Sequence, residues 1–217
     1  ALWLPAQNVY AVEDDYALWL LASTSGDLGD QEQSSWRYMF HGEYRLFNAL
    51  EGTRQVVGRT GIGYQLSRGF SIWLRYDFHY TNSRERGALR ENRLQQVVDW
   101  AGDGPGITTI KMRGIIEERW LEGRDGTGLR LRLQARVEWP MQGRSGTNWV
   151  VWVEPFYDLR TLNWVNNGWN QNRTFLGASL PLCSGDQLEL GYMNQWGNPF
   201  GDRDIMSHTL LAQYRFR

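Results

Sequence analysis

The residues with the most chemical capacity in this chain are arginines and carboxylates that occupy every second position of long segments. In the segment 129–139, Arg130, Arg132, Arg136 and Glu138 alternate with apolar residues. A guanidinium group binds a carboxylate through two parallel hydrogen bonds, so such a row can hold anions or pair with acidic side chains. The residues that we expect to carry this chemistry are Arg75, Arg113, Arg119, Arg130, Arg132, Arg136, Arg173, Glu138 and Glu154.

Enzymatic chemistry has little support in the sequence, which contains three histidines. Nucleophilic catalysis needs a serine activated by a neighbouring histidine. Ser207 and His208 are adjacent, and successive residues of a strand point to opposite faces, so these two side chains are not expected to pair. The sequence has no G-x-S-x-G, no H-E-x-x-H and no paired cysteines. We therefore expect no catalytic residue, no metal site and no cofactor, while cross-strand partners of the histidines stay open.

The elements that must position the charged residues are long strands. An alternation of apolar and polar residues is typical of a strand with one apolar face, and segments such as 129–139 are longer than the usual strand of a soluble domain. Their length suits a tilted strand that crosses a bilayer, for which about 9–11 residues are needed. The predicted strands, separated by Gly- and Asp-rich turns, are 13–24, 34–47, 53–66, 70–83, 89–100, 106–121, 128–139, 148–159, 169–182, 186–197 and 205–217.

Three observations favour a barrel with its apolar face towards lipid over a soluble barrel with that face inward. A barrel of ten or more strands is too wide to be filled by apolar side chains alone. Tryptophans gather near strand ends, where a membrane meets water. The chain ends on Tyr-Arg-Phe-Arg, which is close to the terminal aromatic residue of outer-membrane barrels. The mean hydropathy of −0.54 and the absence of a long apolar run exclude a membrane-spanning helix.

The fold that we predict is all-β, an antiparallel up-and-down transmembrane β-barrel of about 12 strands, with 10 as the alternative. Even numbers are usual in bacterial single-chain barrels. Residues 1–11 are either the remnant of a signal peptide or a first strand, and residues 12–217 form the barrel. If the C-terminus is periplasmic, 67–69, 101–106 and 183–186 face the periplasm. The segments 82–89, 122–127, 160–168 and 198–204 then face outward.

Several phrases of the sequence, in order along the chain, resemble a known bacterial family. They are DDYALWL (14–20), GIGYQLSRGFSIWLRY (61–76), ENRLQQ (91–96), VWVEPFYDL (151–159), NQNRTFLGASL (170–180) and LELGYMNQW (188–196). The family is the one known as domain of unknown function 2490. The resemblance implies an outer-membrane barrel and carries over no activity. The general build is also similar to small porins for acidic oligosaccharides, without a shared motif.

The function that we expect is passive passage of small anionic or polar solutes through an Arg-rich lumen, in the outer membrane of a Gram-negative bacterium. Two alternatives stay open: a closed structural or adhesive barrel in which Arg–Glu ladders seal the lumen, and a lipid-modifying barrel enzyme. The expected partners are outer-membrane lipid and small anions. We expect a monomer, and the net charge of −1 gives no general attraction to nucleic acid.

Overall fold

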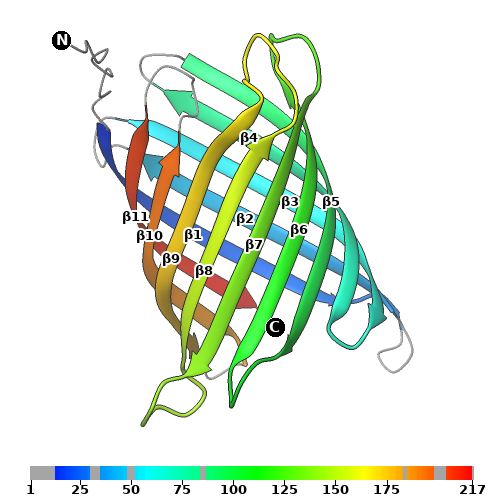
Figure 1. The fold of residues 1–217 in the computed structure, drawn as a ribbon, viewed down its shortest axis with the longest axis vertical. Helices are drawn as coiled ribbons and strands as arrows, with labels where there is room; N and C mark the ends of the chain where they lie inside the picture. Colours follow the sequence, from blue (N-terminus) through cyan, green and yellow to red (C-terminus); the bar gives the residue numbers. More distant parts are fainter. Residues whose placement is uncertain are drawn as a thin grey trace, which may run out of the picture.

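The computed structural model describes residues 13–29, 35–47, 52–83, 87–182, 185–197 and 204–216, which fold into a closed β-barrel (Figure 1). Its strands are β1 (Glu13–Asp27), β2 (Trp36–Phe47), β3 (Thr53–Ser67), β4 (Phe70–Ser83), β5 (Gly87–Asp103), β6 (Thr109–Leu121), β7 (Gly128–Pro140), β8 (Asn148–Asp158), β9 (Gly168–Pro181), β10 (Gln187–Gly197) and β11 (Ile205–Phe216). The predicted strand segments are confirmed, with ends that shift by no more than three residues. Within the described ranges, no helix is long and apolar enough to cross a membrane.

The predicted number of strands, 12 or 10, was wrong. The described sheet closes with eleven strands, and not with twelve or ten, because β1 pairs with both β2 and β11. All other neighbours are antiparallel, and an odd number of up-and-down strands leaves the first and last strands parallel at the seam. Residues 1–11, expected to be either a signal-peptide remnant or a first strand, lie outside the described residues.

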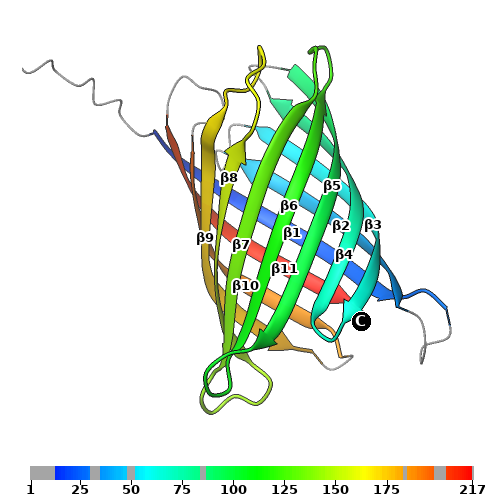
Figure 2. The same cartoon turned by 45° about the vertical axis from the view of Figure 1, so that its right-hand side comes forward.

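The strands are strongly tilted around the barrel, as Figure 2 shows. The paired residues of adjacent strands can be followed once around the barrel, starting from Asp27 at one end of β1. This path returns to β1 at Glu13, which is the other end of the same strand. Such a shift is the geometric condition for closing a tilted sheet. With an odd number of strands, β1 begins at one end of the barrel and β11 finishes at the other (Figures 1 and 2).

We call the end at which β11 finishes the lower end, and the end at which β1 begins the upper end. The turns at 67–69 and 104–108 belong to the lower end, whereas 122–127 and 159–167 belong to the upper end. Gly69 allows the tight β3–β4 turn, since it has a φ of 82° and a Cβ atom there would lie 2.1 Å from the carbonyl oxygen of Ala101. This grouping of the turns agrees with the one predicted from the sequence.

Alternation places charged side chains inside the barrel and large apolar side chains outside it. Glu117 and Asp77 are fully buried in the interior, whereas Leu210 and Leu176 on the outer face are 63% and 55% exposed. The charged face of the predicted strands is thus the inner one, which was the orientation favoured by the width of the barrel.

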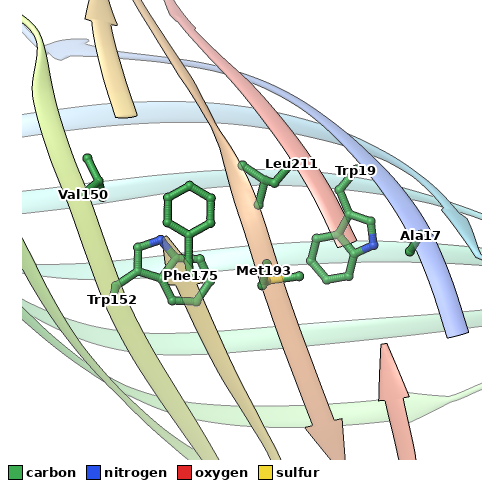
Figure 3. Packing of buried hydrophobic residues seen from close by; sticks show 7 residues of the cluster. All are labelled: Ala17, Trp19, Val150, Trp152, Phe175, Met193 and Leu211. Carbon is green, nitrogen blue, oxygen red and sulfur yellow. The ribbon is translucent and has the colours of Figure 1, made fainter. Parts of the chain in front are cut away.

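One sector of the interior is apolar, which the sequence analysis did not predict. Side chains from β8, β9, β10, β11 and β1 pack there against one another (Figure 3). The members of this apolar sector are Ala17, Trp19, Val150, Trp152, Phe175, Met193 and Leu211. Trp152 and Phe175 stack with ring centres 5.3 Å apart. Gly177 and Gly191 leave room for Phe175, because a Cβ atom on either would lie 2.5 Å from its ring.

The packing around Phe175 gives a stability prediction. We expect Gly177→Ala to lower the free energy of unfolding by about 1–3 kcal/mol, because the added methyl group overlaps the Phe175 ring and the Leu190 carbonyl oxygen. The measurement is the urea midpoint of the refolded protein. Gly42→Ala is the matched control, since nothing lies within 4 Å of its Cβ position, and it should be neutral or slightly stabilising. Equal losses in both variants would contradict this account.

Candidate functional site in the barrel lumen

The candidate site is the lumen itself, which holds a cavity of about 1550 Å³. This cavity extends along the barrel. It is lined near the upper end by residues such as Asp15 and Ser83, and near the lower end by residues such as Ser71 and Arg215. Polar and apolar side chains therefore share one elongated space inside the sheet. Three groups of charged residues divide this space along its length.

The middle group is a continuous belt to which each strand from β2 to β9 contributes one inward side chain near its middle. In strand order the belt is Glu43, Arg59, Asp77, Gln95, Glu117, Arg132, Glu154 and Arg173. The Nε of Arg59 lies 2.7 Å from the Oδ1 of Asp77, and the amide of Gln95 donates to both Asp77 and Glu117 at 3.1 and 2.7 Å. Each member thus contacts the next across adjacent strands.

The second half of the belt continues the alternation of charge. A guanidinium nitrogen of Arg132 lies 3.1 Å from Glu117, and another lies 2.8 Å from Glu154. Arg173 closes the series at 3.8 Å from the other oxygen of Glu154. Charges removed from water are tolerated only when they are paired, so this alternation is what allows the belt to be buried.

The remaining strands complete the circle with the apolar sector. Here Met193, Leu211 and Trp19 take the positions of the belt residues on β10, β11 and β1. Arg45 and Arg173 both lie over the ring of Trp19, with 3.9 and 5.0 Å between the Cζ atom and the ring centre. Arg45 pairs with Glu43 and Arg173 is the last belt residue, so these cation–π contacts join the two ends of the charged belt to the apolar sector.

A smaller charged group lies above the belt. The Nε of Arg119 lies 2.5 Å from Glu91, and the Nε of Arg130 lies 2.8 Å from Asp158. Trp164, from the segment between β8 and β9, reaches this group with its ring centre 5.3 Å from the Cζ atom of Arg119. The indole N–H of Trp164 also donates to the backbone oxygen of Asp125, so it ties two segments of the upper end together.

The third group lies between the belt and the lower end, and cations outnumber carboxylates in it. We call it the lower vestibule, and its charged residues are Arg75, Lys111, Arg113, Arg136, Arg215, Asp99, Glu138 and Glu189. Each of the three carboxylates is shared by two cations. Asp99, for example, lies 2.9 Å from Arg75 and 2.5 Å from Arg113. With five cations and three carboxylates, the group has uncompensated positive charge near the lower end of the barrel.

The structure places all nine predicted residues on the inner face, but it distributes them among the three groups. Arg132, Glu154 and Arg173 belong to the belt, and Arg119 and Arg130 belong to the group above it. The lower vestibule contains Arg75, Arg113, Arg136 and Glu138. Two members that sequence reasoning missed are Gln95 and Asp99, although both lie at alternate positions of β5 and share the parity of Glu91.

The serine and histidine near the C-terminus do not meet. Ser207 points into the barrel and donates to Asp15 at 3.3 Å, whereas His208 lies on the outer face. There Nδ1 of His208 lies 2.6 Å from the Tyr192 hydroxyl, and Nε2 lies 3.4 Å from Asp14. These are the cross-strand partners that the sequence left open. Among the residues that the structure describes, no group of three or more His, Cys, Asp or Glu is placed to hold a metal ion.

The belt yields a sharp test because its acidic member Glu117 is followed directly by Glu118 on the outer face. Glu117→Gln removes a fully buried negative charge that Arg93, Arg130 and Arg132 share, so we expect a loss of about 3–5 kcal/mol in the free energy of unfolding. Glu118→Gln makes the same chemical change on the outer face, where the side chain is only partly buried, and it should stay within about 0.5 kcal/mol of the parent. Unfolding in urea measures the stability of both variants. Similar losses of stability in the two variants would show that the belt does not stabilise the fold.

Comparison with known proteins is consistent with this architecture. The chain is 26% identical, over 199 residues, to an uncharacterized protein of Methylorubrum extorquens, a match that covers 90% of this chain and 85% of that protein. No solved structure matches the chain. Residues 16–206 match the family model described as a protein of unknown function (DUF2490). This match spans every strand in whole or in part, so the resemblance seen in the sequence is confirmed and the chain belongs to the DUF2490 family.

Proposed function

We propose that this protein is an outer-membrane β-barrel of a Gram-negative bacterium and that it lets small anionic solutes pass through its lumen. The membrane location is supported by the outer face, on which large apolar side chains from every strand are exposed. Examples are Leu20, Phe40, Ile62, Leu74, Val98, Ile116, Leu133, Val153, Leu176, Leu190 and Leu210. Soluble monomers rarely expose apolar surface so widely, whereas lipid covers such a surface without cost.

The observation that carries the anion preference is the surplus of cations in the lower vestibule. Glu138 lies 2.6 Å from both Lys111 and Arg136, and Glu189 is likewise shared by Arg136 and Arg215. Uncompensated positive charge in a narrow space lowers the barrier for anions and raises it for cations. In our proposal the lower vestibule collects anions, and the belt is the constriction that they must pass. We propose that the protein acts as a monomer and carries out no catalysis.

A second candidate, a closed structural barrel, is favoured by the belt. Asp77, Gln95 and Glu117 are fully buried, and the amide nitrogen of Gln95 donates to both carboxylates without a solute between them. A network of buried, paired charges resists opening, because separating the partners leaves charges buried without compensation. The two candidates differ in whether the ion pairs of the belt separate far enough for an ion to pass. A measurement of single-channel conductance decides between them.

The membrane location has its own test. We expect the protein expressed in a Gram-negative host to remain in the outer-membrane pellet after washing with alkaline carbonate, and to require detergent for extraction. Unheated and boiled samples should differ in gel mobility, because a closed barrel stays folded in the detergent until it is heated. Recovery of folded protein in the soluble fraction without detergent would contradict the proposal.

Passage of anions is tested by single-channel recording in planar bilayers under a potassium chloride gradient. We expect conductance steps with a reversal potential of the sign for anion preference, and Arg113→Glu should shift it towards cation preference. Arg90→Glu is the matched control, since Arg90 pairs with Glu122 outside the lumen. The closed-barrel candidate holds instead if the parent protein gives no steps while the double variant Arg132→Met, Glu154→Met does. Cation preference in the parent would overturn the anion proposal.

A further inference from the structure

Two flat side chains, Trp73 and Arg75, lie side by side on the inner wall of the lower vestibule. Each faces a glycine in the register of β3, Gly63 opposite Trp73 and Gly61 opposite Arg75. A Cβ atom on Gly63 would lie 2.4 Å from the Trp73 ring, and one on Gly61 would lie 2.8 Å from Cγ of Arg75. Both side chains therefore lie against backbone that carries no side chain of its own, and they form a flat surface on the wall.

The Trp73 ring is held in place and remains accessible from the lumen. Its indole N–H donates to the hydroxyl of Ser71 at 3.0 Å, which fixes the orientation of the ring. Trp73 is only partly buried and lines the cavity. The part of the ring that does not cover Gly63 is therefore accessible from the vestibule, beside the guanidinium group of Arg75. Flat rings stack favourably on such a surface.

Cations lie next to this ring. The Cζ atom of Arg75 is 5.4 Å from the centre of the Trp73 ring, and Arg75 shares Asp99 with Arg113. The Nε of Arg75 is buried and has no hydrogen-bond partner among the described residues. The Arg113 side chain is 37% exposed, so its guanidinium group can reach a ligand in the cavity. One carboxylate between two guanidinium groups leaves a binding position for a second carboxylate.

We propose that this corner of the lower vestibule binds carboxylates that carry a flat aromatic ring. The ring stacks on Trp73, and the carboxylate accepts hydrogen bonds from Arg113 and Arg75. This inference rests on the proposed function, because it presumes that anions enter the lower vestibule, and it adds the class of anion that is held there. An acyclic carboxylate gains only the charge interaction, whereas an aromatic carboxylate gains the stacking interaction as well.

The experiment measures binding of benzoate, cyclohexanecarboxylate and acetate to the detergent-solubilised full chain by isothermal titration calorimetry. We expect benzoate to bind about 3- to 10-fold more tightly than acetate, the factor that corresponds to a typical aromatic contact. Cyclohexanecarboxylate has a similar size but no flat ring, so it should bind more weakly than benzoate. Trp73→Leu should abolish the preference for benzoate and leave acetate binding unchanged, whereas Arg113→Gln should weaken the binding of all three.

The matched control is Trp149→Leu, which removes a tryptophan near the same end of the barrel from the outer face. It should leave the preference for benzoate intact. Gly63→Ala keeps Trp73 but forces its ring off the wall, and it should reduce the preference as well. If benzoate and acetate bind equally, or if Trp149→Leu acts like Trp73→Leu, the inference fails while the anion proposal stands. If no carboxylate binds at all, the anion proposal fails with it.

Discussion

Charged groups enclosed by a sheet must neutralise one another, and the interior of this barrel is organised by that requirement. From β2 to β9 each strand sends one polar side chain into the belt, and cations such as Arg59 and Arg132 each lie between two carboxylates. Because each belt residue contacts its neighbours on adjacent strands, the belt links eight strands of the barrel from inside. The sheet therefore has two sources of cohesion, the backbone ladder and the ion pairs within it.

The apolar sector is the complement of the belt. Where β10, β11 and β1 meet, the parallel seam has no belt residue, and Met193, Leu211 and Trp19 fill the same level. Strand β1 is consequently apolar on both faces, with Trp19 inside and Leu20 exposed on the outside. The cation–π contacts of Arg45 and Arg173 with Trp19 join the two regions. The interior is thus divided around its circumference as well as along its axis.

The division along the axis is the basis of the function that we propose. In the belt, carboxylates alternate with arginines or with Gln95, whereas the lower vestibule holds five cations and three carboxylates. In the function that we propose, the surplus of positive charge in the lower vestibule favours capture of anions at that end of the barrel. The Trp73 ring lies within that vestibule, so charge and stacking act at the same place.

The sequence alone determined the strands, their faces and the inward position of all nine predicted residues, because alternation within a strand is a local property. It did not determine the number of strands in the closed sheet, the parallel seam or the apolar sector. These depend on the register between strands that are distant in the chain, since register decides which inward side chains share a level. Alternation placed Arg132 and Arg136 on the same face of β7, but only the tilted, closed sheet put Arg132 in the belt and Arg136 in the lower vestibule.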